Sequence, residues 1–285
     1  MIISASYRTD IPAFYAGWFF ERLRQGFARA ANPYSAQPYE VSLRREDVDG
    51  FVFWTRNFQP MMGRLDRLLG FGRPFVVQFT VTGYPRSLEA AVVPVDKAVE
   101  QIQALSQNVH PLCPVWRYDP VVISEATPRC FHIAQFSRLA RRLEGAVDEV
   151  VISLVQLYAK SLRNLRKTGL AVIDPAAEEK RELASDLAAI ARRHGMTLAV
   201  CSQPEFAAEG CGEARCVDAA RLSAIAGYPV HAPLKGNRPG CACHQSRDIG
   251  AYDTCPHGCV YCYAVRDRAL ALNRYRSHRA SGEAL

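Results

Sequence analysis

A short segment near the C-terminus carries three cysteines whose spacing is suited to metal chemistry. Cys255, Cys259 and Cys262 follow the pattern C-x3-C-x2-C, with Tyr261 just before the last of them. Three thiolates on one short loop can hold three irons of a 4Fe-4S cube and leave the fourth iron without a protein ligand. An iron in that position can bind a small molecule. We therefore expect a 4Fe-4S cluster with one open iron at this loop.

Three other kinds of site share parts of this spacing. A c-type haem site requires histidine directly after the second cysteine of C-x-x-C, where this chain has Tyr263. A redox dithiol at Cys259 and Cys262 would leave Cys255 without a role. A zinc ion could recruit His257 as a fourth ligand, although four ligands so close together depart from the usual two-plus-two spacing. The zinc and dithiol alternatives stay open, and the iron-sulfur cluster is favoured.

A second group of cysteines precedes this loop, since eight of the ten cysteines fall in the C-terminal third of the chain. Thiols in a reducing compartment stay free for metals or catalysis, which argues against a disulfide framework. Cys201, Cys216, Cys241 and Cys243 could supply four thiolates to an auxiliary 4Fe-4S cluster or to a structural zinc ion. Cys211 could replace one member. The alternative is a set of unrelated buried thiols.

The length and composition predict a folded protein with a sizeable core. The chain has 285 residues, 49% of them hydrophobic, and no apolar run in the sequence is long enough to span a bilayer. Its first residues lack the pattern of a secretory signal peptide, so we expect a cytoplasmic protein with no membrane partner. A formal net charge of +7 permits a polyanionic partner without requiring one.

Alternating strand and helix patterns must position these cysteines. N-cap and proline signals predict helix starts at Asp10 and Asp174. A short strand over residues 248–253 precedes the cysteine loop, and a terminal helix is expected from Tyr263 to about Arg279. β-branched and aromatic runs predict six earlier strands, with amphipathic helices between them. These strands are residues 2–6, 50–55, 75–81, 115–118, 149–155 and 197–201.

Strands separated by helices predict an α/β protein with a parallel sheet. At six or more units, a parallel β/α barrel of the TIM type, closed or partial, is the natural solution. An open doubly wound sheet is the alternative. The expected organisation is barrel units over residues 1–203, a cysteine-rich insertion over 204–247, and a strand, cluster loop and helix over 248–285 that complete the barrel.

The cysteine loop resembles the cluster loop of radical S-adenosylmethionine (SAM) enzymes, in the C-P-x-G-C-x-Y-C-Y-A form of the spore photoproduct lyase-like branch. Over the whole chain the match is closer to the uncharacterised DUF1848 family, which supplies no substrate. The residues that carry this resemblance are Ile3–Ser6, Arg8–Pro12, Val52–Thr55, Asn57, Trp116–Pro120 and Asp248–Tyr252.

The resemblance implies both a chemistry and a rearranged chain order. The open iron would bind SAM, and an electron from a reductant such as flavodoxin or ferredoxin would cleave its sulfonium. The resulting 5'-deoxyadenosyl radical would abstract hydrogen from a substrate. A small molecule, a peptide and a nucleic acid all stay open as substrates. Most radical SAM proteins carry the cluster loop after the first strand, whereas here it follows the last, which implies a circular permutation.

Side chains at the carboxyl ends of barrel strands are expected to face the cofactor. Ser6 and Arg8 could bind the carboxylate of SAM. Asp10 is assigned to the same site, although a helix N-cap would also explain it. By resemblance, Tyr261 packs close to the adenine, with a hydrophobic plug beneath the loop as its alternative.

Further polar side chains at strand ends are candidates for the reaction itself. Arg117 and Asp119 are assigned to catalysis, with a structural ion pair as the alternative. If no SAM is cleaved, the chain would be a non-catalytic iron-sulfur or zinc protein acting as a redox sensor or interaction module. The other residues expected at the same mouth are Trp54, Thr55, Asn57, Gln78, Thr80 and Tyr118.

Overall fold

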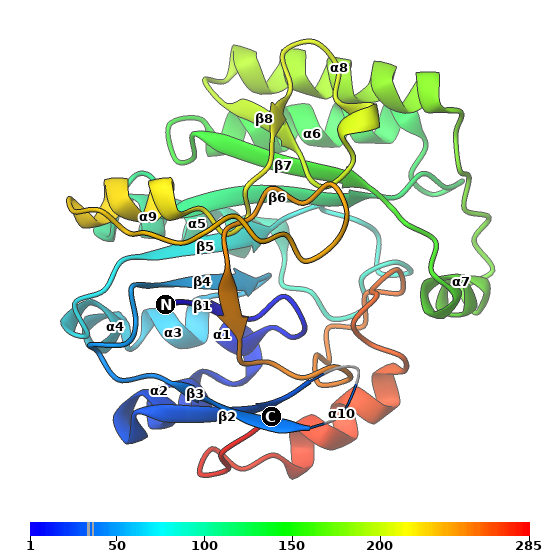
Figure 1. The fold of residues 1–285 in the computed structure, drawn as a ribbon. Coiled ribbons are helices and arrows are strands. Elements are labelled where there is room, and N and C mark those ends of the chain that lie inside the picture. The colour runs from blue at the N-terminus through cyan, green and yellow to red at the C-terminus, as the bar shows by residue number, and fades with distance from the viewer. Residues whose placement is uncertain (33–34, 36) are drawn as a thin grey trace.

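A parallel eight-stranded sheet forms the centre of the protein. The computed structural model describes residues 1–32, 35 and 37–285. The strand order is β10-β1-β4-β5-β6-β7-β8-β9, and neighbouring strands are parallel throughout (Figure 1). The strands are β1 Ile2–Ala5, β4 Gly50–Thr55, β5 Phe75–Thr80, β6 Pro114–Val121, β7 Glu149–Leu154, β8 Thr197–Val200, β9 Gly212–Glu213 and β10 Ser246–Asp248. An antiparallel hairpin pairs β2 (Phe27–Ala31) with β3 (Pro38–Ser42).

Helices follow most strands of the large sheet. Within the described residues, no helix is both long enough and apolar enough to cross a membrane. A short 3-10 helix spans Pro204–Phe206. The α-helices are α1 Ile11–Phe14, α2 Ala16–Gln25, α3 Gln59–Met62, α4 Leu65–Gly70, α5 Val95–Asn108, α6 Arg129–Leu143, α7 Ala159–Arg166, α8 Ala177–Arg193, α9 Ala219–Ala226 and α10 Arg268–Ser277.

The sheet is wound in one direction and remains open. From β1 to β9 the strands of the sheet follow chain order, with no reversal of the kind that defines a doubly wound sheet. The predicted parallel β/α alternation is therefore confirmed. Of the two expected forms, closed and partial, the fully closed barrel is wrong, because β9 and β10 form the two edges. These strands are only two and three residues long, which limits the backbone groups available to close the sheet.

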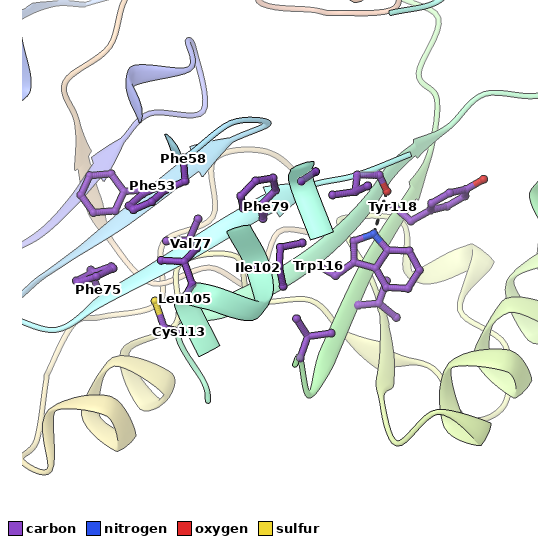
Figure 2. Packing of buried hydrophobic residues seen from close by; sticks show 14 of the residues in the cluster. Phe53, Phe58, Phe75, Val77, Phe79, Ile102, Leu105, Cys113, Trp116 and Tyr118 are labelled. Carbon is purple, nitrogen blue, oxygen red and sulfur yellow. Dashed lines mark hydrogen bonds between the residues drawn. The ribbon is translucent and has the colours of Figure 1, made fainter. Parts of the chain in front are cut away.

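Each face of the sheet carries its own core, since successive side chains alternate between the faces. The larger core buries Phe53, Val77 and Phe79 against helical residues such as Ile102 and Leu105 of α5 (Figure 2). We call this side the outer face.

On the other side, which we call the inner face, Val52 and Val76 pack against Val217, Leu222 and Val230. Leu222 belongs to α9, and Val217 and Val230 flank that helix. The cysteine-rich segment therefore covers the inner face, whereas most helices cover the outer one.

Several element boundaries differ from the sequence prediction. Asp10 caps α1 as expected, but Asp174 is not a cap: α8 begins at Ala177, and Asp174 pairs instead with Lys180 at 2.6 Å. The final strand ends at Asp248 instead of beginning there. The Asp248 carboxylate accepts a hydrogen bond from the Gly250 N–H at 2.9 Å. This local turn directs the chain out of the sheet. The terminal helix begins at Arg268, because Asp267 provides the N-cap.

Candidate functional site

The three-cysteine loop, residues 255–262, lies at the carboxyl end of the sheet, as predicted. His257 Nε2 is 2.8 Å from Asp10 Oδ2, and Arg56 Nη2 donates to the Tyr261 hydroxyl at 2.6 Å. Asp10 follows β1, and Arg56 directly follows β4. The loop is therefore anchored above the ends of the two strands that carry the first polar side chains of the site.

Backbone hydrogen bonds hold the loop in place from the side. Ala91 N donates to His257 O at 2.9 Å, and Val260 N donates to Leu88 O at 3.1 Å. Gly258 has a φ of 75°, in the left-handed region, and a Cβ there would lie 2.5 Å from Arg268 Cδ. The glycine thus allows both the turn and the close approach of α10.

The three loop thiols are free. Cys255, Cys259 and Cys262 are all partly exposed. Burial raises the pKa of Cys259 to about 12, and Arg56 partly opposes that shift. Without a metal these groups are neutral thiols, so metal binding would release their protons. Among residues 1–32, 35 and 37–285, no three His, Cys, Asp or Glu side chains are already arranged around one metal position.

A buried polar network supports the loop from beneath. Arg56 Nη1 lies 2.8 Å from Glu89 Oε1, and both side chains are buried. The Tyr261 hydroxyl donates to the same Glu89 oxygen, and Thr82 Oγ1 also donates to it at 2.6 Å. The sequence prediction missed Arg56 and Glu89. The place of Arg56 directly after a strand could have indicated it, whereas Glu89 lies in an irregular segment without such a signal.

Tyr261 is a buried component of this network. Its ring packs in a small hydrophobic cluster with Tyr84, Leu88 and Leu165. Ser161 of α7 donates to its backbone carbonyl at 3.0 Å. This position matches the alternative expectation for Tyr261, which is a hydrophobic plug beneath the cysteine loop.

Asp10 joins the first helix to the cysteine loop. It accepts hydrogen bonds from Ala13 N at 2.9 Å, Thr55 Oγ1 at 2.7 Å and Arg56 N at 2.8 Å, in addition to its contact with His257. The N-cap interpretation is confirmed. The cap accounts for only one of these four contacts, and the other three position β4 and the loop.

A second buried carboxylate organises the end of β1. Asp248 accepts from Ser4 Oγ at 2.9 Å, Ser6 Oγ at 2.7 Å and Tyr7 N at 3.1 Å. Arg8 Nε lies 3.7 Å from the same carboxylate. Burial raises the pKa of Asp248. Two of the predicted cofactor residues, Ser6 and Arg8, are therefore turned toward a carboxylate that the sequence prediction did not assign to the site.

A family model described as a domain of unknown function, DUF1848, matches residues 2–264. The chain belongs to the DUF1848 family. The matched region includes every strand of the large sheet and all three loop cysteines, and it ends before α10. Among curated proteins, none matches the chain. The family description supplies no activity, so the function must be argued from the site.

Arg117 is the centre of a polar row on the inner face of this DUF1848 protein. Its Nη1 lies 3.1 Å from Gln78 Oε1 and 2.9 Å from Cys216 Sγ, and its Nε donates to Asp119 Oδ2 at 3.1 Å. The guanidinium also stacks over Trp54, 5.1 Å from the ring centroid. The predicted pairing of Arg117 with Asp119 is thus present.

Two other residues predicted at this mouth make contacts elsewhere. Tyr118 was expected to face the site, but it points to the outer face, where its hydroxyl lies 2.9 Å from His132 Nδ1. The alternation of side chains along β6 requires this, because Arg117 occupies the inner face. Asn57 accepts from Gln101 at 3.1 Å and so serves the packing of α5.

The second group of cysteines is brought together on the inner face of the DUF1848 sheet. Cys201 Sγ and Cys216 Sγ are 3.7 Å apart. Cys216 and Cys243 are buried in the same cluster as Cys201, and Cys241 packs against it. Cys211 lies elsewhere, with its thiol directed to Ala184 O at 4.0 Å, and it packs against the outer core.

Proposed function

We propose that this DUF1848 protein is a radical SAM enzyme whose cysteine loop holds a 4Fe-4S cluster. The observation that carries the proposal is the place of Cys255, Cys259 and Cys262 at the carboxyl end of a parallel β/α sheet. In β/α barrels, this end of the strands is where reactive groups gather. The loop would leave one iron without a protein ligand.

The donor set suits such a cluster. All three donors are thiols, which is the ligand type that iron-sulfur clusters use. The positive charge of Arg56 near Cys259 would favour an anionic cluster, and Ala264 N donates to Cys262 Sγ at 3.4 Å. Hydrogen bonds and nearby charges of this kind tune cluster potentials. The partial exposure of the thiols leaves a route for iron to enter.

When bound, the cluster and SAM together would supply a 5'-deoxyadenosyl radical that abstracts hydrogen from the substrate. The chain's own residues would hold and orient these groups. Asp10 would fix the loop through His257, and Arg56 would fix it through Tyr261. Arg8 Nε makes no hydrogen bond but lies 3.7 Å from the Asp248 carboxylate, so in this proposal Asp248 orients the guanidinium that binds the carboxylate of SAM.

The circular permutation is part of the same proposal. Strand β10 pairs with β1 in parallel, with Ser4 opposite Asp248. The unit made of β10, the cysteine loop and α10 therefore stands beside the first strand, as a first β/α unit would. In this proposal the C-terminal unit takes the place that the first β/α unit holds in most radical SAM proteins.

The substrate class stays undetermined among small molecules, peptides and nucleic acids, and a reductant such as flavodoxin or ferredoxin would supply the electron. Arg117 and Asp119 are proposed to contact the substrate, because they lie toward the carboxyl end of β6 on the inner face. Their pairing would keep the buried guanidinium oriented.

Anaerobic reconstitution with iron and sulfide tests the proposal. We expect about four irons per chain at the loop, a change in the electron paramagnetic resonance signal of the reduced cluster when SAM is added, and formation of 5'-deoxyadenosine. Cys259→Ser should lose all three results. Cys130→Ser, at an exposed position on α6, is the matched control and should retain them.

The SAM-dependent spectral change separates an inactive enzyme from a different function, because it needs no substrate. A stable cluster whose spectrum is unaffected by SAM would contradict the proposal and favour the non-catalytic redox sensor. Retention of the cluster in Cys259→Ser would contradict the assignment of the ligands.

A further inference from the structure

Four thiols from distant parts of the chain lie in one row within the same packed cluster on the inner face. Cys201 follows β8, Cys216 lies ahead of α9, and Cys241 and Cys243 precede β10. Cys201 Sγ and Cys216 Sγ are 3.7 Å apart, and Cys243 and Cys241 pack in the same cluster. Cys201, Cys216 and Cys243 are buried, and Cys241 is partly exposed at the end of the row.

The spacing of Cys201 and Cys216 is that of two ligands to a single ion. Four thiolates at ~2.3 Å from a tetrahedral zinc ion lie ~3.8 Å from one another. Cys201 Sγ and Cys216 Sγ are 3.7 Å apart before any metal is bound. Thiolates on a 4Fe-4S cube each bind a different iron and lie much farther apart. No three of the described side chains already surround one metal position, so the other thiols would have to rotate toward this pair to complete a tetrahedron.

Positive charge surrounds the row as an anionic metal site requires. Arg117 Nη1 lies 2.9 Å from Cys216 Sγ, and Arg238 Nη2 lies 3.6 Å from Cys201 Sγ. Val217 N also donates to Cys243 Sγ at 3.4 Å. Neutral thiols would gain little from two guanidinium groups, whereas a zinc ion with four thiolates carries two negative charges. Such outer contacts orient ligands and stabilise bound metal.

The segment that carries three of these thiols has little regular structure to hold it. Between β8 and β10 it contains the short strand β9, one turn of 3-10 helix and α9, which has eight residues. Its contact with the sheet includes Ala214, Val217 and Val230. A metal ion shared with Cys201 would attach this segment to the end of β8 and stabilise the cover of the inner face.

We infer that Cys201, Cys216, Cys241 and Cys243 form a structural zinc site, separate from the cysteine loop. This inference does not rest on the proposed radical SAM function, because a zinc site would hold the inner face in either case. All four positions are thiols, so the site would be closed, without an open coordination position for a substrate.

Metal analysis of the reconstituted full chain tests the inference. We expect one zinc per chain in addition to the irons of the loop, and X-ray absorption at the zinc edge should show four sulfur neighbours at ~2.3 Å. Exchange with cobalt should produce the visible bands of a tetrahedral cobalt thiolate. These measurements use the unmodified protein and do not depend on a variant that folds.

Variants then assign the ligands. Cys241→Ser, at the partly exposed end of the row, and Cys243→Ser should each lower the zinc content at least fivefold. Cys211→Ser should leave it unchanged. Cys259→Ser should lose iron but keep zinc, which separates this inference from the proposed function. About eight irons and no zinc, a zinc shell containing nitrogen or oxygen, or full zinc retention in both Cys241→Ser and Cys243→Ser would overturn it.

Discussion

His257 Nε2 lies 2.8 Å from Asp10 Oδ2, although 247 residues separate the two in the chain. The contact joins the helix that follows the first strand to the loop that follows the last. It is possible because β1 and β10 are neighbours in the sheet. The start of the chain and the cysteine loop are therefore one structural unit, and changes at either end should affect both.

Asp10→Asn should destabilise the protein without removing the helix cap. Asparagine caps helices as well as aspartate does, but one of its two oxygens is replaced by an amino group. That group would face His257 or the Arg56 N–H. We expect urea unfolding to show a loss of about 1–3 kcal/mol in the free energy of unfolding. The loop should also retain less iron.

The control for this prediction is Asp174→Asn. The Asp174 carboxylate is exposed and pairs with Lys180, so its loss should cost at most about 1 kcal/mol. Equal effects of the two variants would show that the contacts of Asp10 with Arg56 and the loop contribute no more to stability than an exposed ion pair.

Glu89→Gln should be among the more destabilising single changes in this region. It would leave the buried Arg56 guanidinium without its charged partner, which typically costs about 3–5 kcal/mol. Tyr261→Phe removes a hydroxyl that bonds to both residues, and we expect a loss of about 1–3 kcal/mol. Urea unfolding measures both values. Tyr275→Phe, at an exposed ring, is the control, and a smaller effect of Glu89→Gln than of that change would contradict the network.

Stability should fall as the pH falls below about 6.5, partly because of His132. Burial lowers the pKa of this histidine to about 4, so it is neutral in the folded protein at pH values where the unfolded chain is protonated. The unfolded state then binds more protons, and the free energy of unfolding decreases with falling pH between about 6.5 and 4. The loss attributable to His132 should reach about 3 kcal/mol.

His132→Gln checks this contribution. The variant should show a shallower decrease in the free energy of unfolding between pH 7 and pH 4.5, measured by urea unfolding at several pH values. His231→Gln, at an exposed position, should keep the slope of the unmodified protein. Parallel pH profiles for the unmodified protein and His132→Gln would mean that His132 does not titrate differently on folding.

Gly258→Ala should disturb the cysteine loop more than an ordinary glycine replacement. The residue has a positive φ, and the new Cβ would lie 2.5 Å from Arg268 Cδ. Gly169→Ala is a matched control, because Gly169 has a φ of 71° but no atom within 4 Å of the added Cβ. Backbone strain alone costs about 1–2 kcal/mol. We expect both variants to lose this amount of stability. Gly258→Ala should lose more than Gly169→Ala in thermal unfolding, and only Gly258→Ala should lower the iron content.

Local sequence patterns predicted the strands correctly. They did not predict the polar network under the cysteine loop. Runs such as residues 50–55 and 75–81 are β-branched and aromatic, and they form β4 and β5 with at most one residue of difference. Glu89 could not be found in this way. It lies in an irregular segment, and its partner Arg56 is distant in sequence.

Two element boundaries also depended on side-chain hydrogen bonds that the sequence patterns did not predict. Asp174 followed by Pro175 is a strong start signal for a helix, yet α8 begins at Ala177, with Glu179 Oε2 accepting from Ala176 N at 3.1 Å. Likewise, β10 ends early because Asp248 takes up hydrogen bonds from the end of β1 and from Gly250.

The sequence by itself determined the alternation of strands and helices and the two groups of cysteines, because side-chain periodicity and spacing are properties of neighbouring residues. The tertiary structure decided that the sheet stays open, that Cys201 meets Cys216, and that Asp10 holds the cysteine loop. Those outcomes depend on which strands pair and on which face each side chain lies. Both are set by packing between segments far apart in the chain, which no local pattern contains.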